Sequence, residues 1–135
     1  MRILIAEDDL VSRRFLQKLL NEYGDCDLVI DGIEAIDAFM MSLRLEEYYD
    51  LICLDIMMPR VDGIKVLKTM RDLEEKLNVK SEHKAKIVMT TALGETDIVK
   101  QAFEYGCDAY ASKPIDTQKL LEVMYNLNLI KNSII

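Results

Sequence analysis

The stretch Leu51-Ile52-Cys53-Leu54-Asp55-Ile56-Met57-Met58-Pro59 decides the fold. The apolar run at its start is too apolar for a surface loop and too short for a helix, so it predicts a buried strand from whose end Asp55 emerges. Three other apolar runs lead in the same way into polar residues, namely Glu7-Asp8-Asp9, Thr91 and Lys113. The rest of the chain is organised around these strand ends.

Length and composition are those of one ordinary globular domain. The chain has 135 residues, of which 50% are apolar and 30% are charged, and a chain of this size buries about two-thirds of its unfolded surface. The net charge of −7 argues against a nucleic-acid surface, which would carry a clustered basic face. No apolar run approaches the roughly 20 residues of a membrane span, and no signal peptide precedes Arg2. We therefore expect no membrane insertion and a single domain over residues 1–135.

The cysteines and the histidine do not indicate a metal or redox centre. Cys26, Cys53 and Cys107 are odd in number, widely separated and placed in or beside apolar runs. This pattern predicts reduced, buried thiols and a cytoplasmic protein. A zinc site would need paired cysteines at C-x-x-C spacing, which the chain lacks. His83, the single histidine, lies in a polar segment and is expected to be solvated rather than catalytic.

Strand-like runs alternate with helical patterns five times. This alternation is typical of an α/β protein with a doubly wound parallel sheet covered by helices on both faces. The expected strands are residues 3–6, 26–30, 51–54, 87–90 and 107–112.

Apolar residues recur at helical spacing after each predicted strand. The first helix, with Asp9 as its N-cap and Gly24 as its stop, is expected to turn Arg13 to solvent. Its predicted inward face is Val11, Phe15, Leu16, Leu19, Leu20 and Tyr23. The predicted inward face of the third helix, which follows Gly63, is Val66, Leu67, Met70, Leu73 and Leu77. Residues 95–97 should begin the fourth helix, and Asp116 or Thr117 should cap the fifth.

The strand ends should meet at one site. In a doubly wound parallel sheet the carboxyl ends of the strands share one edge, and ligands bind in the crevice there. Carboxylates about 4 Å apart repel by roughly 4 kcal/mol at an effective dielectric near 20, and a divalent cation offsets this repulsion. Ligands that are all oxygen favour Mg2+ over a transition metal. The residues that converge are Glu7, Asp8, Asp55, Thr91 and Lys113.

These residue types suit phosphoryl chemistry. Lys113 supplies a positive charge and Thr91 a hydroxyl, and with Mg2+ they match the outer oxygens of a phosphoryl group. Asp55 is the candidate nucleophile, because a carboxylate that attacks phosphorus gives an acyl phosphate. Each residue taken alone could be a solvated strand end or a helix cap. The convergence of the whole set favours a site.

The chain resembles the receiver domains of two-component response regulators, especially the single-domain, CheY-like kind. The resemblance covers nearly the whole chain and implies a flavodoxin-like fold with strand order 2-1-3-4-5 and five helices. Its most specific parts are Ile3 to Asp9, Leu54 to Pro59 with Asp62-Gly63, Thr91-Ala92, and Tyr110 with Lys113-Pro114.

The resemblance also implies a role for each site residue. Asp55 would be the phosphorylated aspartate. Asp8 would bind Mg2+ directly, Glu7 through a water molecule, and Met57 through its backbone carbonyl. Thr91 would be the switch hydroxyl, Tyr110 the aromatic residue that changes rotamer with it, and Lys113 the lysine that pairs with the phosphate. The bond between Lys113 and Pro114 would be cis.

The implied function is a cytoplasmic phosphorylation switch, rather than an enzyme that turns over a substrate. A histidine kinase or histidine phosphotransfer protein would supply the phosphoryl group, which Asp55 would accept stoichiometrically and lose slowly. The changed surface of the fourth helix, fifth strand and fifth helix would then bind another protein, with no output domain in the chain. We expect a monomer or weak dimer.

Two other functions stay open at this point. A Mg2+-dependent phosphohydrolase also uses an aspartyl nucleophile, but such enzymes need a second aspartate two residues on, and here that residue is Met57. A binding module that never meets phosphate is the other possibility, and it fits poorly with the complete set of site residues.

Two departures from the usual receiver pattern stand out. The connections around Leu43 to Tyr49 and Leu73 to Lys86 are several residues long, and an extension of the second and third helices would account for them. Met57 and Leu93 flank the site where many receivers have polar side chains. We predict that these two apolar groups hinder the hydrolytic water and prolong the life of the phosphoryl group.

Overall fold

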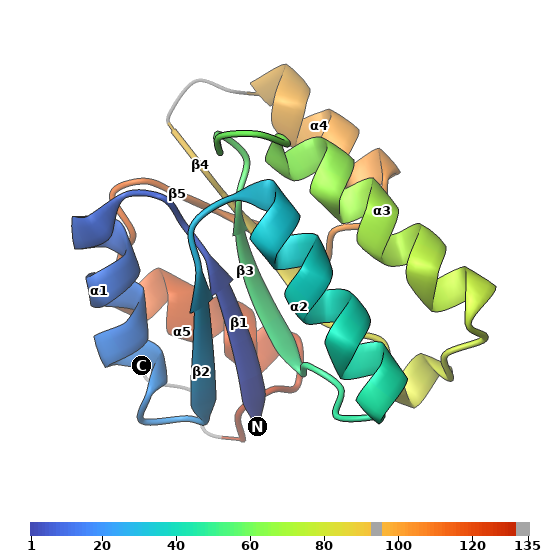
Figure 1. Cartoon of the computed structure of the whole chain (residues 1–135). Coiled ribbons are helices and arrows are strands. Elements are labelled where there is room, and N and C mark those ends of the chain that lie inside the picture. The colour runs from blue at the N-terminus through green and yellow to red at the C-terminus, as the bar shows by residue number, and fades with distance from the viewer. Residues whose placement is uncertain (93–95, 132–135) are drawn as a thin grey trace.

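The structure, a computed structural model, describes residues 1–92 and 96–131. A parallel sheet of strand order β2-β1-β3-β4-β5 lies between two layers of helices (Figure 1). The strands are β1 (Arg2–Ala6), β2 (Asp25–Val29), β3 (Leu51–Asp55), β4 (Lys86–Thr91) and β5 (Ala109–Ser112). The helices are α1 (Leu10–Leu20), α2 (Gly32–Leu45), α3 (Gly63–Lys76), α4 (Thr96–Glu104) and α5 (Thr117–Asn126), with a 3-10 turn at Ser81–His83. The predicted fold and strand order are confirmed.

The hydrophobic core has two halves because successive side chains of a strand point to opposite faces. Ile3 and Ile5 of β1 pack with residues of α1 and α5, whereas Leu4 and Ala6 pack with residues of α2 and α3. Figure 1 shows α1 and α5 on one face of the sheet and α2, α3 and α4 on the other. Every residue of β3 is therefore buried, and only its carboxyl end leads to the surface.

Aspartates fix where the helices begin. Each N-cap side chain accepts a hydrogen bond from a backbone N–H in the first turn, which would otherwise have no partner. The donor-to-acceptor distances are 2.8 Å at the α1 cap and 3.2 Å at the α5 cap. The caps are Asp9, Asp31, Asp62 and Asp116. The caps predicted at Asp9 and Asp116 are confirmed.

The predicted inward face of α1 is wrong in part. Leu16 and Leu20 are buried, but Val11 is 76% exposed and Phe15 is 41% exposed. The reason is that α1 packs mainly against β1 and β2 at one side of the sheet, so the part of its surface that faces the core is narrow. Leu77 is also exposed, at 52%, because α3 ends at Lys76 and the chain turns away there.

Long helices account for only part of the two long segments. Both α2 and α3 have 14 residues, but they end at Leu45 and Lys76, so most of residues 43–49 and 73–86 lies in connections and in the 3-10 turn. The remaining connections meet where the Tyr48 ring stacks on His83, with ring centroids 4.6 Å apart. His83 is exposed, as predicted, although this stacking partner lies too far away in sequence to be predicted.

The cysteines are free thiols. Cys53 and Cys107 are buried and Cys26 is half-buried. Burial raises the pKa of Cys53 to about 12 and that of Cys107 to about 11, so these thiols stay protonated and unreactive at neutral pH. Among the described residues, no helix combines the length and apolar character that crossing a membrane requires.

Candidate functional site

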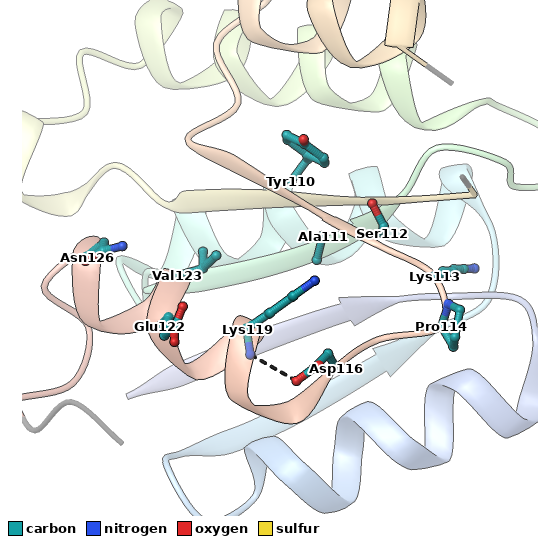
Figure 2. Close-up of a pocket in the computed structure, with 10 residues that line it drawn as sticks. All are labelled: Tyr110, Ala111, Ser112, Lys113, Pro114, Asp116, Lys119, Glu122, Val123 and Asn126. Carbon is teal, nitrogen blue, oxygen red and sulfur yellow. Dashed lines mark hydrogen bonds between the residues drawn. The ribbon is translucent and has the colours of Figure 1, made fainter. Parts of the chain in front are cut away.

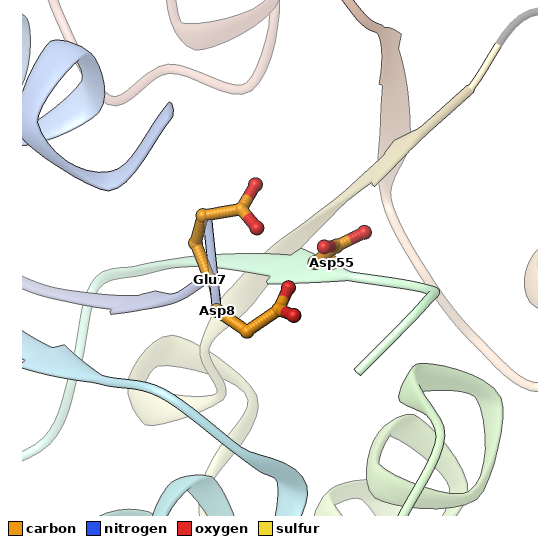
Figure 3. A group of neighbouring side chains, drawn as sticks. All are labelled: Glu7, Asp8 and Asp55. Atoms are coloured by element: carbon orange, nitrogen blue, oxygen red, sulfur yellow. The ribbon is translucent and has the colours of Figure 1, made fainter. Parts of the chain in front are cut away.

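Three carboxylates meet at the carboxyl edge of the sheet (Figure 3). Glu7 and Asp8 follow β1, and Asp55 ends β3, which pairs with β1 so that Ala6 lies beside Leu54. One carboxylate oxygen from each acidic residue lies within 4.8 Å of the others. Glu7 and Asp55 are buried, whereas Asp8 is exposed. The predicted convergence is confirmed for this acidic cluster.

Lys113 joins the acidic cluster from the end of β5. Its ammonium nitrogen lies 2.6 Å from Glu7 Oε1 and 3.0 Å from Asp55 Oδ2. Its backbone N–H donates a 2.7 Å hydrogen bond to Thr91 O, which fixes the strand end. The Lys113–Pro114 bond is cis, as predicted. One lysine therefore bridges two buried carboxylates that come from different strands.

Burial and charge shift the pKa values of this cluster. Burial raises the pKa of Glu7, and the Asp55 carboxylate raises it further, although the Lys113 ammonium lowers it in part. Burial by itself would lower the pKa of Lys113, but its contacts with Glu7 and Asp55 outweigh burial and raise that pKa. With Glu7, Asp8 and Asp55 ionised, the single Lys113 ammonium leaves the cluster with two uncompensated negative charges. The site is thus suited to a divalent cation.

The acidic cluster matches a Mg2+ site in chemistry and in size. Mg2+ takes oxygen ligands at about 2.1 Å, so ligands on opposite sides of the ion lie about 4.2 Å apart. One carboxylate oxygen from each of the three residues lies within 4.8 Å of the others, which is close enough for a single ion to contact them.

The loop after Asp55 is tightly placed. Asp55 Oδ1 accepts a hydrogen bond from Met57 N at 3.1 Å, and Ile56 N donates to Thr90 O at 3.0 Å. Gly63, at the start of α3, packs so closely that a Cβ atom there would lie 2.3 Å from Asp55 O. A side chain at Gly63 would therefore push the loop after Asp55 out of position. Met57 is 66% exposed and lines a groove between α3 and α4.

Arg13 supports the acidic loop, and sequence reasoning missed it. The pattern of α1 predicted an outward side chain, but Arg13 is half-buried. Its guanidinium donates to Glu7 O at 3.0 Å and Asp8 O at 3.2 Å. The sequence signal for this contact was the short distance along the chain between Arg13 and the acidic loop. A long basic side chain near the start of a helix can reach back to the loop that precedes the helix. Gly63 was seen only as a helix start, although its closeness to Asp55 matters more.

The two predicted switch residues lie at the sheet edge but apart from the acidic cluster. Thr91 is buried, and its hydroxyl donates to Ala92 O at 3.3 Å. Tyr110 is 46% exposed, and its ring meets that of Phe103 edge to face at 6.1 Å between centroids. The structure records no hydrogen bond from either side chain to the acidic cluster among the described residues. Leu93, predicted to flank the site, lies outside the described residues.

A groove of about 590 Å³ lies between β5 and α5, beside the site (Figure 2). Tyr110, Lys113 and Pro114 line the groove from the strand side, and Asn126 of α5 lies at the end away from Lys113 (Figure 2). In Figure 2 the Asp116 cap bonds to the backbone of Lys119 on the first turn of α5. The strand that carries the exposed Tyr110 therefore leads directly to the lysine in the acidic cluster.

Comparisons with known proteins agree with this geometry. A family model described as the response regulator receiver domain matches residues 3–125. The chemotaxis protein CheY of Treponema pallidum (strain Nichols) is 32% identical over 123 residues, which are 90% of this chain and 78% of that protein. A probable histidine kinase 2 of Oryza sativa subsp. indica is 30% identical over 142 residues, but these are 98% of this chain and only 13% of the kinase. The chain thus spans a small part of such kinases.

Solved structures share the fold. A chain of the CheX-CheY-BeF3-Mg2+ complex from Borrelia burgdorferi has a TM-score of 0.81 and 25% identity, and the match covers 95% of this chain and 89% of that chain. A chain of the Saccharomyces cerevisiae complex between the histidine phosphotransfer protein Ypd1 and the receiver domain of Ssk1 has a TM-score of 0.78. That match, at 23% identity, covers 98% of this chain and 93% of that chain, and it is a likeness of fold.

Proposed function

Because the chain belongs to the response regulator receiver domain family, we propose that it is a switch of a two-component or phosphorelay system that is set by phosphorylation of Asp55. The phosphoryl group comes from a histidine kinase or a histidine phosphotransfer protein. The observation that carries the proposal is the position of Lys113, whose ammonium lies 3.0 Å from Asp55 Oδ2 within a cluster of carboxylates. A nucleophile, a cationic partner and a set of metal ligands are thus already together.

The transfer step can be written on these residues. A carboxylate oxygen of Asp55 attacks the phosphorus of a phosphohistidine, the new O–P bond forms, and the P–N bond breaks with its electron pair leaving on the imidazole nitrogen. The product is an acyl phosphate on Asp55. Lys113 pairs with the charge that the phosphoryl oxygens bring. Asp8, Asp55, the backbone carbonyl of Met57 and, through a water molecule, Glu7 would hold Mg2+, which would supply further neutralisation of that charge.

The new phosphoryl group then changes a second surface. In the proposed switch the Thr91 hydroxyl turns from Ala92 O toward the phosphoryl oxygens, and the Tyr110 ring leaves its exposed position beside Phe103 and turns inward. The surface of α4, β5 and α5, including the groove of Figure 2, then binds a downstream protein with a different affinity. A phosphoryl group can shift this equilibrium only by its differential affinity for the two states.

The donor docks next to the site, on the exposed start of α1. Leu10, Val11 and Phe15 are 48%, 76% and 41% exposed, and this helix begins directly after Asp8 and Asp9. Exposed apolar side chains gathered beside a reactive group are typical of a protein interface. The yeast complex of Ypd1 with a receiver domain of the same fold supports a phosphotransfer protein as one such donor. The free thiols suit work in the reducing cytoplasm.

Acetyl phosphate labelling in the presence of Mg2+ tests the proposal. We expect one phosphoryl group per chain, seen by intact mass, no labelling of Asp55→Asn, and strong loss of labelling in Asp8→Asn. Beryllofluoride with Mg2+ should shift the amide NMR signals of Thr91 and Tyr110. Repeated turnover of a small phosphate ester would contradict the switch and favour the phosphohydrolase, and labelling that persists in Asp55→Asn would refute the site.

A further inference from the structure

A second groove, of about 510 Å³, lies between α3 and α4 on the face opposite α1. Its lining is largely apolar, with Ile64 from α3, Ile98 from α4, Tyr105 directly after α4, and Ile56 and Met57 from the loop after Asp55. Ile64 and Ile98 are only half-buried and Tyr105 is 37% exposed. Apolar side chains from three segments are therefore gathered on an open surface.

Two lysines line the same groove. Lys65 and Lys68 are exposed and stand one helical turn apart on α3, so they share a face of that helix. The Lys68 ammonium lies 5.7 Å from the centroid of the Tyr105 ring, which holds it over the groove. Neither lysine forms an ion pair within the part of the chain that the structure describes. Two cationic groups thus border an apolar groove on a protein whose net charge is −7.

We propose that the α3–α4 groove binds a segment of a partner protein in which one or two apolar anchor residues are flanked by Asp or Glu. The anchors contact Ile64, Ile98 and Tyr105, and the acidic side chains pair with Lys65 and Lys68. An amphipathic segment laid into a groove between helices is a common mode of peptide recognition. The remaining surface is acidic overall, so it repels such a segment elsewhere, and the two lysines select this groove.

A nucleotide fits the groove less well. A phosphate site normally offers backbone N–H groups or hydroxyls that converge with a cation, whereas the polar groups of this groove are the two lysines, Gln101 and the carboxylate of Asp62. The long side chains of Lys65 and Lys68 can reach carboxylates at several positions along a peptide. Two separate, flexible cations therefore suit an extended acidic peptide better than a compact anion.

Selection of random 12-residue peptides displayed on phage against the whole unphosphorylated chain tests this proposal. We expect the selected peptides to carry net negative charge and an aromatic or branched aliphatic anchor. Their synthetic forms should bind the double variant Lys65→Glu/Lys68→Glu and the variant Tyr105→Ala about tenfold or more weakly. Amide NMR signals of Gln101 and Ile98 should shift on binding.

The matched control is the double variant Lys76→Glu/Lys80→Glu, which makes the same change in net charge at the far end of α3. Peptides should bind it as they bind the native chain. Equal loss of binding in both double variants, peptides without acidic residues, or failure to select any peptide would each overturn the proposal. A nucleotide that shifts the same amide signals at lower concentration than any peptide would also overturn it. Acetyl phosphate labelling of Asp55 in each variant checks the fold and tests the proposed switch separately.

Discussion

Arg71 holds together the end of the molecule opposite the acidic cluster, and its removal gives the sharpest stability prediction. Its guanidinium donates to Glu74 Oε1 at 2.7 Å, to Ala85 O and Gly106 O at 2.9 Å, and to Asp108 Oδ2 at 2.9 Å. The Glu74 side chain is 1% exposed and that of Arg71 is 20% exposed. One guanidinium therefore ties α3 to the starts of β4 and β5.

The variant Arg71→Met keeps an unbranched stem but removes all of these donors. The buried Glu74 carboxylate is left with one hydrogen bond, from Ala85 N at 2.9 Å. Removing one partner of a buried ion pair costs about 3–5 kcal/mol, because the other charge stays buried without compensation. Domains of this size unfold with a free energy of about 5–15 kcal/mol. We expect the free energy of unfolding to fall by about 3–5 kcal/mol, which brings the domain close to its stability limit.

Urea unfolding followed by far-ultraviolet circular dichroism measures this loss. The double variant Arg71→Met/Glu74→Met removes both charges and should recover at least about half of the lost free energy, because an apolar pair often replaces a buried ion pair without cost. Arg14→Met, on the exposed face of α1, is the matched control and should change stability by less than about 0.5 kcal/mol. A loss below about 1 kcal/mol in Arg71→Met, or no recovery in the double variant, would refute the reasoning.

Three further predictions concern the acidic cluster. Met57→Asn should shorten the life of the acyl phosphate severalfold, because a polar side chain can position the hydrolytic water, and unchanged decay of the labelled protein would contradict this. Mg2+ affinity, measured by calorimetry, should weaken as the pH falls through the pKa of Glu7, which lies above 4.5, because protons compete with the ion. If Mg2+ affinity depends on pH in Glu7→Gln as it does in the native chain, the prediction is wrong. Gly63→Ala should slow acetyl phosphate labelling about tenfold or more by moving Asp55, whereas Gly24→Ala, which makes an equally close contact with Met1 O, should lower stability without that effect.

The sign of the Glu7 effect on stability follows from the same direction of shift. Because the pKa of Glu7 is higher in the folded protein than its usual value of 4.5, the folded state holds this proton more tightly than the unfolded chain does. The group therefore favours folding below pH 4.5, and this contribution is lost as the pH rises through the raised pKa. Saturating Mg2+ should reverse the trend, since the ion binds the ionised and folded form.

The strands and the acidic cluster could be predicted because strong local signals set them. A short run of apolar residues has few alternatives to a buried strand, and in a parallel sheet the side chains that follow such strands must meet. Glu7, Asp8, Asp55 and Lys113 were placed together correctly for this reason. The directions of Thr91 and Tyr110 could not be predicted, because the rotamer of a strand-end side chain depends on contacts from other elements.

The errors lie where a helix meets only part of the sheet. The spacing of apolar residues identifies the apolar face of α1. How much of that face is buried depends on how far α1 overlaps the strands, which the spacing does not show. Val11 and Phe15 were therefore predicted to be buried, although they are exposed. Arg13 was placed outside because charge suggested solvent, yet backbone carbonyls of the acidic loop offer it better partners. Leu77 fits the periodicity of α3, but the helix ends one residue earlier. Each error comes from tertiary geometry that no local pattern contains.

The two buried charge clusters at opposite ends of the sheet differ in how completely they are compensated. Around Arg71, the buried Glu74 carboxylate and the half-buried Asp108 carboxylate accept hydrogen bonds from the guanidinium and from the backbone N–H groups of Ala85 and Ile87. At the carboxyl edge, Lys113 is the one cationic side chain recorded within 4.0 Å of the carboxylates of Glu7 and Asp55 in the described residues. A satisfied cluster stabilises the fold in a single state. The acidic cluster keeps two uncompensated negative charges, so added positive charge would stabilise it. Its charge balance would therefore change if a metal ion and a phosphoryl group bound there.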